Sequence, residues 1–239
     1  MIPAYNFDKI KFATDTATFE KAINLYESGK VTKFKKYLSG FSAIVKSTHL
    51  YNVDVSARHY DRGSCECYLD QTDILCKHMV AVALYAVMDG KPLLDKDKQK
   101  ISTPTSSGKV GELTKEELNK YKKNVTAAMR YIKAYDMPSK YWFQYQNSLD
   151  EGVSRLSTIV SELPIGQTSA ELLISTLLRL DDKLCNSGVD DSNGTVGNFI
   201  EETVRVLKNY KQSVPDIRKI FKKLEGVETC FGWEKPLLF

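Results

Sequence analysis

Four residues that could bind a metal ion fall within fourteen consecutive positions of this chain. Cys65-Glu66-Cys67 is followed by eight residues and then by Cys76-Lys77-His78, which makes a C-x-C…C-x-H arrangement. Zinc (Zn2+) is bound by four sulfur or nitrogen donors at tetrahedral corners, and three cysteines with one histidine supply such a set. Because four protein donors leave no position for a catalytic water, we expect the ion to hold structure.

Two other uses of these cysteines fit the sequence less well. A disulfide would leave one of the three unpaired, neighbours in a C-x-C pair bridge poorly, and the N-terminus lacks the pattern of an export signal. A thioredoxin-like redox site needs C-x-x-C ahead of a helix, and that spacing is absent. The two remaining cysteines, Cys185 and Cys230, stand alone in the sequence, and we expect them to be core residues.

The residues before the metal-binding pattern predict a small antiparallel sheet. Alternating apolar and polar residues indicate strands over 31–38, 41–46 and 51–56, with Ser39-Gly40 as the two-residue turn of the first hairpin. Cys65-Glu66-Cys67 then lies on a fourth strand or on the turn that ends it. The zinc ion is therefore expected at an edge of this sheet.

Helices are predicted on both sides of the sheet segments. Thr14 or Asp15 can cap a first helix that ends at Ser28, where Gly29 takes the left-handed position. Cys76 and His78 open a second helix over residues 79–88, which is apolar nearly all round and must be buried. A unit this small has little core, so the metal should supply much of its folding free energy.

This pattern resembles the SWIM zinc finger, whose signature is C-x-C, a variable spacer and C-x-H. The resemblance covers about residues 19–88 and includes Gly29-Lys30-Val31, the strands and the apolar helix. It implies zinc binding by Cys65, Cys67, Cys76 and His78 and a role in recognising DNA or protein, with no shared catalytic activity. Residues 140–239 are similar to the helical tails of stand-alone prokaryotic SWIM proteins. Such proteins are often encoded beside MoxR-type ATPases and von Willebrand-type adhesion-domain proteins, so the resemblance suggests a MoxR-type ATPase as partner.

The composition changes after the apolar helix. Residues 89–113 are rich in charge, Ser, Thr, Pro and Gly and are expected to form a linker between a zinc-binding domain (1–88) and a helical domain (114–239). In the helical domain, Thr114 and Thr168 each begin a capping-box pattern, and Pro215 opens the last predicted helix. The predicted fold class is α+β: a small zinc-stapled antiparallel sheet with flanking helices, then an all-α bundle or short helical stack.

One loop of the helical domain contains several acidic and small residues. Gly188 to Gly194 looks like a calcium-binding loop, but that motif needs acids where this chain has Val189 and Ile200. Capping of the following helix, residues 195–210, by Asp191 or Ser192 is the better interpretation.

A lysine-rich stretch on the first predicted strand is the best candidate for nucleic-acid contact. Strict alternation would place Lys33, Lys35 and Tyr37 on one face, where two cations and an aromatic ring could follow a phosphate backbone. The alternative is a solvent-facing edge strand whose lysines prevent pairing with other strands.

Three expectations about function follow from the whole chain. No nucleophile elbow, phosphate-binding glycine loop or His/Asp set is present, so we expect no enzyme and no catalytic residues. No apolar run approaches the length of a membrane span, so we expect a cytoplasmic protein. A formal net charge of +4 permits weak nucleic-acid binding without demanding it. The sequence therefore leaves two functions open, a nucleic-acid-binding accessory factor and a protein-interaction adaptor.

Overall fold

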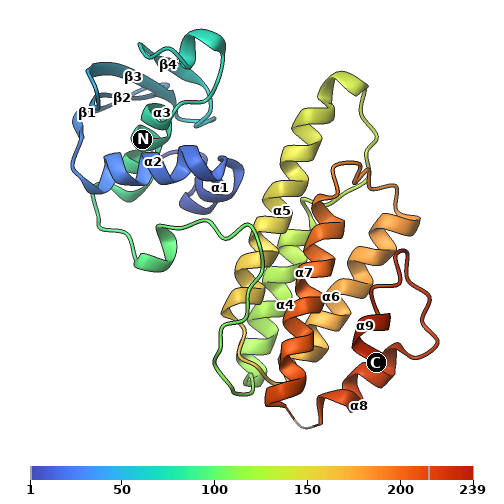
Figure 1. Cartoon of the computed structure of the whole chain (residues 1–239). Helices are drawn as coiled ribbons and strands as arrows, with labels where there is room; N and C mark the ends of the chain where they lie inside the picture. The colour runs from blue at the N-terminus through green and yellow to red at the C-terminus, as the bar shows by residue number, and fades with distance from the viewer. Residues whose placement is uncertain (1, 215, 239) are drawn as a thin grey trace. The chain divides into compact units, whose positions relative to one another are not determined.

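The computed structural model describes residues 2–214 and 216–238 and divides into two compact units, residues 1–100 and residues 101–239 (Figure 1). Each unit has its own hydrophobic core. The first unit combines a sheet with helices and the second is helical, which confirms the predicted fold class. The packing of the first unit determines which side chains lie beside the four predicted metal donors.

The first unit contains a four-stranded antiparallel sheet in which each strand pairs with the next. Its strands are β1 (Val31–Tyr37), β2 (Gly40–Lys46), β3 (Leu50–Ser56) and β4 (Gly63–Cys65). Val53 of β3 pairs with Cys65 of β4, so the sheet itself sets the position of the first zinc donor. The fourth strand predicted for the C-x-C segment is thus present and ends at its first cysteine.

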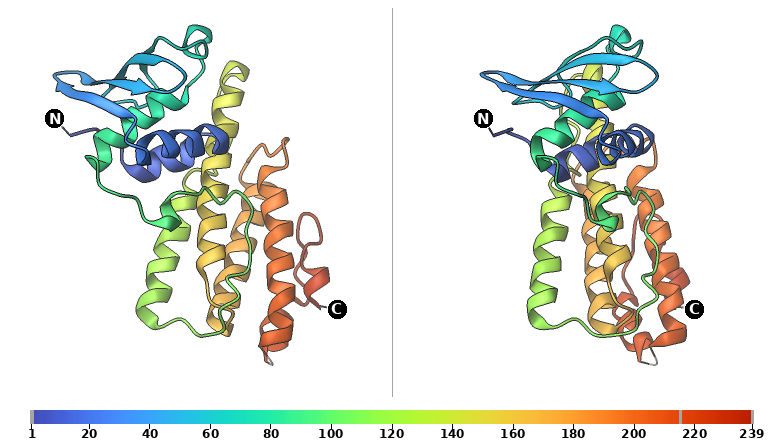
Figure 2. Two further views of the ribbon diagram at one scale, coloured as in Figure 1. Left: turned by 60° about the vertical axis from the view of Figure 1, so that its left-hand side comes forward. Right: turned by 90° about the vertical axis from the view of Figure 1, so that its left-hand side faces the viewer.

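Helix α3 (Lys77–Met88) lies in the middle of the first unit. It packs against all four strands on one side and against α1 (Phe7–Ala13) and α2 (Thr16–Glu27) on the other, as both views in Figure 2 show. Two short 3₁₀ turns, Asp70–Thr72 and Asp95–Asp97, lie before and after it. Contact on both sides explains why this helix is apolar nearly all round.

The ends of α2 are formed as its sequence predicts. The Asp15 carboxylate accepts a hydrogen bond from the Thr18 amide at the start of the helix. At the other end Gly29 has a φ of 64°, and the amides of Gly29 and Lys30 donate to the carbonyls of Tyr26 and Leu25. This pair of bonds is the Schellman arrangement that glycine favours.

The turn of the first hairpin lies one residue earlier than predicted. Leu38 and Ser39 form the turn, and Gly40 is the first residue of β2, paired with Tyr37. The glycine serves a different need, because a Cβ at position 40 would lie 2.3 Å from the carbonyl oxygen of Val55. Close approach of β3, and not turn geometry, requires glycine there.

The second unit is built from helices that pack around one core. The long helices are α4 (Lys115–Met129), α5 (Trp142–Glu162), α6 (Gln167–Asn186) and α7 (Thr195–Ser213), which lie side by side in Figures 1 and 2. Shorter turns of helix are η3 (Ser139–Tyr141), α8 (Ile217–Phe221), η4 (Lys222–Leu224) and α9 (Lys235–Leu238). Pro215, predicted to open the last helix, lies outside the described residues. None of the described helices is both long and apolar enough to cross a membrane.

The start of α6 differs from the prediction. The capping box at Thr114 is present, but Thr168 does not cap a helix, because α6 already begins at Gln167. Its first amides are satisfied from a distance: the Glu112 carboxylate accepts hydrogen bonds from the amides of Gln167 and Thr168. A carboxylate brought from elsewhere in the chain thus replaces the local cap.

The acidic loop before α7 has the capping role favoured by the sequence. Both carboxylate oxygens of Asp191 accept backbone amides of the first turn, those of Val196 and Gly197. The neighbouring Asp190 accepts a hydrogen bond from the indole nitrogen of Trp142 at 3.0 Å. Both acids are therefore used in holding the loop and the helix together.

The segment over residues 89–113 makes ordered contacts with both units. On the side of the first unit, Lys98 pairs with Glu27 at 2.8 Å, and Lys100 donates to the carbonyls of Phe12 and Thr14. On the side of the second, Ser107 donates to the Leu163 carbonyl. The predicted domain limits, 1–88 and 114–239, remain a prediction. In the sequence, the boundary between the two compact units falls between residues 100 and 101.

The isolated cysteines also differ from expectation. Cys185 and Cys230 are exposed and form a disulfide with their Cα atoms 6.1 Å apart, so they are not core residues. Their 45-residue separation hid the pair from any argument based on local spacing.

We predict that Glu112→Gln lowers the free energy of unfolding by about 0.5–2 kcal/mol, because it weakens the cap of α6. Burial acts to raise the pKa of Glu112, but hydrogen bonds from Thr168 and Gln167 outweigh it and hold the pKa below its ordinary value. The stabilisation is therefore complete above the ordinary carboxyl pKa of about 4.3 and is lost as pH falls through the lower folded value.

The measurement is urea unfolding from neutral to acidic pH. Glu116→Gln, on an exposed carboxylate of the same chain region, is the matched control and should change little. Equal effects of the two substitutions would contradict the capping role.

Candidate metal centre

The four predicted donors come from three consecutive pieces of structure. Cys65 is the last residue of β4, Cys67 follows two residues later, and Cys76 is the N-cap residue of α3. His78 lies in the first turn of that helix. The sheet edge and the helix start are thus both fixed by the core, and the intervening loop closes between them.

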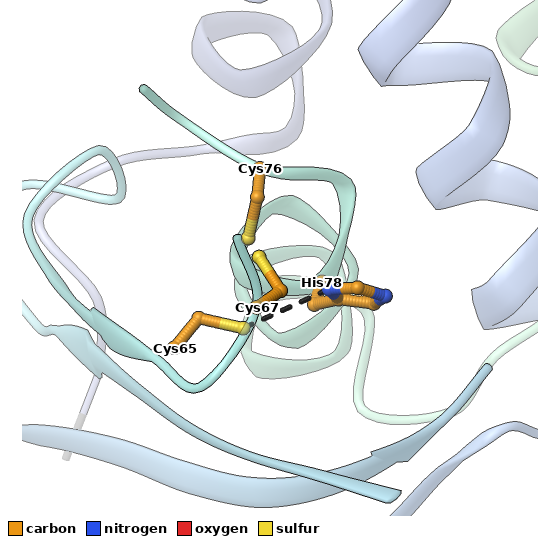
Figure 3. A group of neighbouring side chains, drawn as sticks. All are labelled: Cys65, Cys67, Cys76 and His78. Carbon is orange, nitrogen blue, oxygen red and sulfur yellow. Dashed lines mark hydrogen bonds between the residues drawn. The ribbon is translucent and has the colours of Figure 1, made fainter. Parts of the chain in front are cut away.

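The donor atoms converge and are withdrawn from solvent. All four side chains are buried, and their sulfur and nitrogen atoms lie within 4.8 Å of one another. Figure 3 shows the group, with the Cys65 sulfur 3.7 Å from Nδ1 of His78. The three cysteines are free, so the disulfide alternative is excluded for them.

Electrostatics in the cluster favour negative charge on Cys76. A hydrogen bond from the Cys65 thiol lowers the pKa of Cys76 to about 4, with further help from His78, from the Met79 amide and from Cys67, while burial opposes the shift. The same hydrogen bond, with burial, raises the pKa of the Cys65 thiol. The thiols share charge because they are close, and a divalent cation among them would favour the thiolate form of all three.

The donor set fits zinc. For tetrahedral Zn2+ with bonds of about 2.3 Å to sulfur and 2.0–2.1 Å to nitrogen, a sulfur and the nitrogen are about 3.5–3.6 Å apart, close to the 3.7 Å between the Cys65 sulfur and Nδ1 of His78. The other ring nitrogen of His78, Nε2, is buried without a hydrogen-bond partner among the described residues. Cys65, Cys67, Cys76 and His78 would therefore hold one zinc ion through three sulfurs and a nitrogen.

Neighbouring side chains orient the donors. The Asp70 carboxylate accepts the Cys65 amide at 2.8 Å, and both carboxylate oxygens of Glu66 accept hydrogen bonds from Asn52 on β3. These bonds lower the pKa of Glu66. The ring of Tyr51 stacks on His78 with centroids 4.4 Å apart. The C-x-C turn and the imidazole are thus held in place by the sheet.

Comparison with known protein families decides what this centre is. The family model of the SWIM zinc finger matches residues 51–86. Residues 51–86 are a SWIM zinc finger. The match spans β3, β4, the metal-binding loop and most of α3, and is narrower than the 19–88 range that the sequence suggested. Searches of curated proteins and of solved structures find no match for the chain.

The proposed nucleic-acid residues of β1 are arranged differently from an alternating strand. The register of β1 and β2 shifts between Thr32 and Lys35, so Lys33 lies in a bulge and has a φ of 52°. Lys35 pairs with Ser42, next to Asp54 of β3, and the Tyr37 hydroxyl donates to the Asp54 carboxylate at 3.1 Å. An acidic group therefore lies among the residues proposed to follow a phosphate backbone.

The metal-binding loop has a feature that the sequence analysis did not single out. Between Cys67 and Cys76 the side chains of Tyr68, Leu69 and Ile74 are 76%, 41% and 54% exposed. An apolar residue that is exposed alone needs no explanation, but three on one short loop are candidates for contact with a partner. We call these three residues the finger-loop cluster. Apolar side chains inside a loop closed by cysteines were the available signal.

We predict one zinc ion per SWIM finger and its loss in Cys76→Ser. Structural zinc contributes about 10–16 kcal/mol of apparent binding free energy to small folds, so the first unit should unfold without it. Elemental analysis measures the metal, and near-ultraviolet circular dichroism with heating measures the unfolding.

Cys185→Ser is the matched control, because it removes a cysteine outside the finger and should leave the zinc content at one. The helical signal of the second unit should persist in Cys76→Ser. Zinc retained by Cys76→Ser would contradict the proposed ligand set.

Proposed function

We propose that this protein is a non-catalytic recognition factor in which a zinc-held SWIM finger presents its loop to a protein partner. The observation that carries this proposal is the finger-loop cluster, Tyr68, Leu69 and Ile74, exposed on the loop that zinc closes. Interface cores are enriched in aromatic residues and depleted in charge. The metal would fix the ends of this loop, so the cluster would meet its partner without first losing conformational freedom.

The partner class follows from the family resemblance. Stand-alone prokaryotic SWIM proteins are associated with MoxR-type ATPases, and a separately encoded ATPase of that type is the partner we propose. The finger itself has four protein donors for zinc and hence no open coordination position for substrate. For a cytoplasmic location, the three free cysteines of the finger are the support, whereas a disulfide such as that between Cys185 and Cys230 is more common in oxidising compartments.

A second candidate, nucleic-acid binding by β1, rests on the exposure of its cations. Lys33 and Lys35 are exposed. In the same strand the charge of Lys36 is paired with Asp89, and the Asp54 carboxylate lies against Tyr37, so the net positive charge available there is small. Affinity for a phosphate backbone grows with the number of cations that can each neutralise one phosphate. The geometry therefore favours protein as the principal ligand.

The protein-binding proposal predicts that a Tyr68→Ser, Ile74→Ser double variant loses affinity for the MoxR-type ATPase encoded in the same genome by about tenfold or more. Each buried interface anchor typically contributes over about 1 kcal/mol to binding. Loss of two anchors should therefore weaken the affinity more than tenfold. Titration calorimetry with the purified ATPase measures it. Zinc content should stay at one, since neither residue is a donor.

Leu38→Ser is the matched control, because Leu38 is 91% exposed but lies on the hairpin turn between β1 and β2. Binding unaffected by the double variant would remove the finger-loop cluster from the interface. No binding of the wild type to the ATPase would reject that partner.

The nucleic-acid candidate predicts salt-dependent binding of a labelled oligonucleotide near 50 mM salt. Lys33→Gly with Lys35→Ala should lower the slope of log affinity against log salt by somewhat under two, at about 0.7–0.9 for each phosphate contact. Glycine is chosen at position 33 because the φ of 52° would strain alanine. Removing the exposed Lys21 and Lys91 instead is the control. If the wild type has no affinity, these lysines only protect the sheet edge.

A further inference from the structure

The disulfide between Cys185 and Cys230 joins the end of a long helix to the C-terminal part of the chain. Cys185 lies in the last turn of α6, and Cys230 lies between η4 and α9. Their Cα separation of 6.1 Å is within the range that a disulfide bridges. Neither residue belongs to the SWIM finger, and the proposed function does not use them.

The bond fastens a segment that has little regular structure. We call residues 225–238 the C-terminal strap; α9 (Lys235–Leu238) is its regular element among the described residues. Trp233 and Leu237 are 4% and 1% exposed and enter the core of the second unit. The rest of the strap has few buried groups, and Cys230 and Phe231 are exposed.

A buried carboxylate on α6 forms the noncovalent part of the attachment. Asp181, one turn before Cys185, is 7% exposed. One of its oxygens accepts both the Cys230 amide at 3.0 Å and the indole nitrogen of Trp233 at 2.9 Å. The other oxygen lies 3.7 Å from the Cys185 sulfur. The covalent bond and these hydrogen bonds therefore hold the same few residues of the strap onto the same turn of α6.

The five cysteines of the chain fall into two groups with different access to solvent. The three in the SWIM finger are buried and free, whereas Cys185 and Cys230 are exposed and bonded to each other. Thiol–disulfide exchange requires that an attacking thiolate reach a sulfur, so exposure decides which cysteines react. A small thiol can approach the exposed pair while zinc and the core protect the finger.

We propose that Cys185 and Cys230 are a thiol–disulfide exchange site that fastens the C-terminal strap to α6 when oxidised and releases it when reduced. The reductant is a small thiol of the glutathione class. Its thiolate attacks one sulfur of the pair, the bond between the cysteines breaks, and a mixed disulfide forms while the other cysteine leaves as a thiolate and takes up a proton. A second glutathione thiolate then displaces the remaining cysteine.

The balance of this exchange is two electrons for each pair. The protein gains two thiols and two glutathione molecules become oxidised glutathione, and the reverse reaction closes the bond again. After reduction the strap keeps its noncovalent contacts, which include the hydrogen bonds to Asp181 and the burial of Trp233, Glu234 and Leu237. Local opening is then favoured, because the strap is no longer tied covalently to α6 through the Cys230 side chain.

The experiment compares zinc-loaded full-length protein equilibrated with oxidised or with reduced glutathione. Alkylation after unfolding and zinc removal should count three thiols in the oxidised sample and five in the reduced sample. A glutamate-specific protease should cut the strap, at Glu225, Glu228 and Glu234, severalfold faster after reduction. In a Trp142→Phe background, the emission of Trp233 should shift to the red on reduction. Zinc should remain at one per chain throughout.

Cys185→Ser supplies the matched variant, which should show the fast cleavage in both glutathione buffers. Slow, wild-type-like cleavage of this variant, or equal cleavage of oxidised and reduced wild type, would show that the bond does not control the strap. Five thiols in oxidised glutathione, or three that persist in reduced glutathione, would show that no exchange takes place. A second zinc ion that Cys185→Ser removes would assign Asp181, Cys185 and Cys230 to metal binding instead. None of these outcomes bears on partner binding by the finger loop.

Discussion

The convergence of three thiols and one imidazole between β4 and α3 is the interaction on which the first unit depends. A short strand and a helix start are joined here by a loop that has little apolar burial of its own. Its exposed residues, the finger-loop cluster, cannot stabilise it by hydrophobic contact. Bonds from zinc would replace that contact, because Cys65 is fixed by the sheet and Cys76 and His78 by the start of α3. The position of the loop would thus depend on the metal and on the core together.

The sequence predicted the convergence of the four donors because its information is local. Four donors within fourteen positions restrict the possible arrangements strongly, and the apolar helix after His78 leaves few places for it except against the sheet. The Thr114 capping box and the left-handed Gly29 were predicted for the same reason, since each concerns contacts within one helical turn. Features that depend on contacts between residues close in the sequence can therefore be predicted before the fold is known.

The differences all involve contacts between distant residues. Glu112 caps α6 from 55 positions upstream, Cys185 meets Cys230 across 45, and Gly40 is required by a carbonyl on a strand that pairs later. The bulge at Lys33 has no strong sequence signal, because lysine rarely takes positive φ. Such features become visible only when the partners are placed in space.

The two edges of the sheet determine how the first unit can be approached. On one side β1 has a bulge and exposed lysines, and on the other β4 is three residues long and leads at once into the finger. Bulges, edge lysines and short strands all discourage the addition of a further strand. A peptide that binds here therefore gains little affinity from a ladder of main-chain hydrogen bonds. Selectivity then depends on the shape and chemistry of side chains. Different partners therefore do not all need to bind as extended strands.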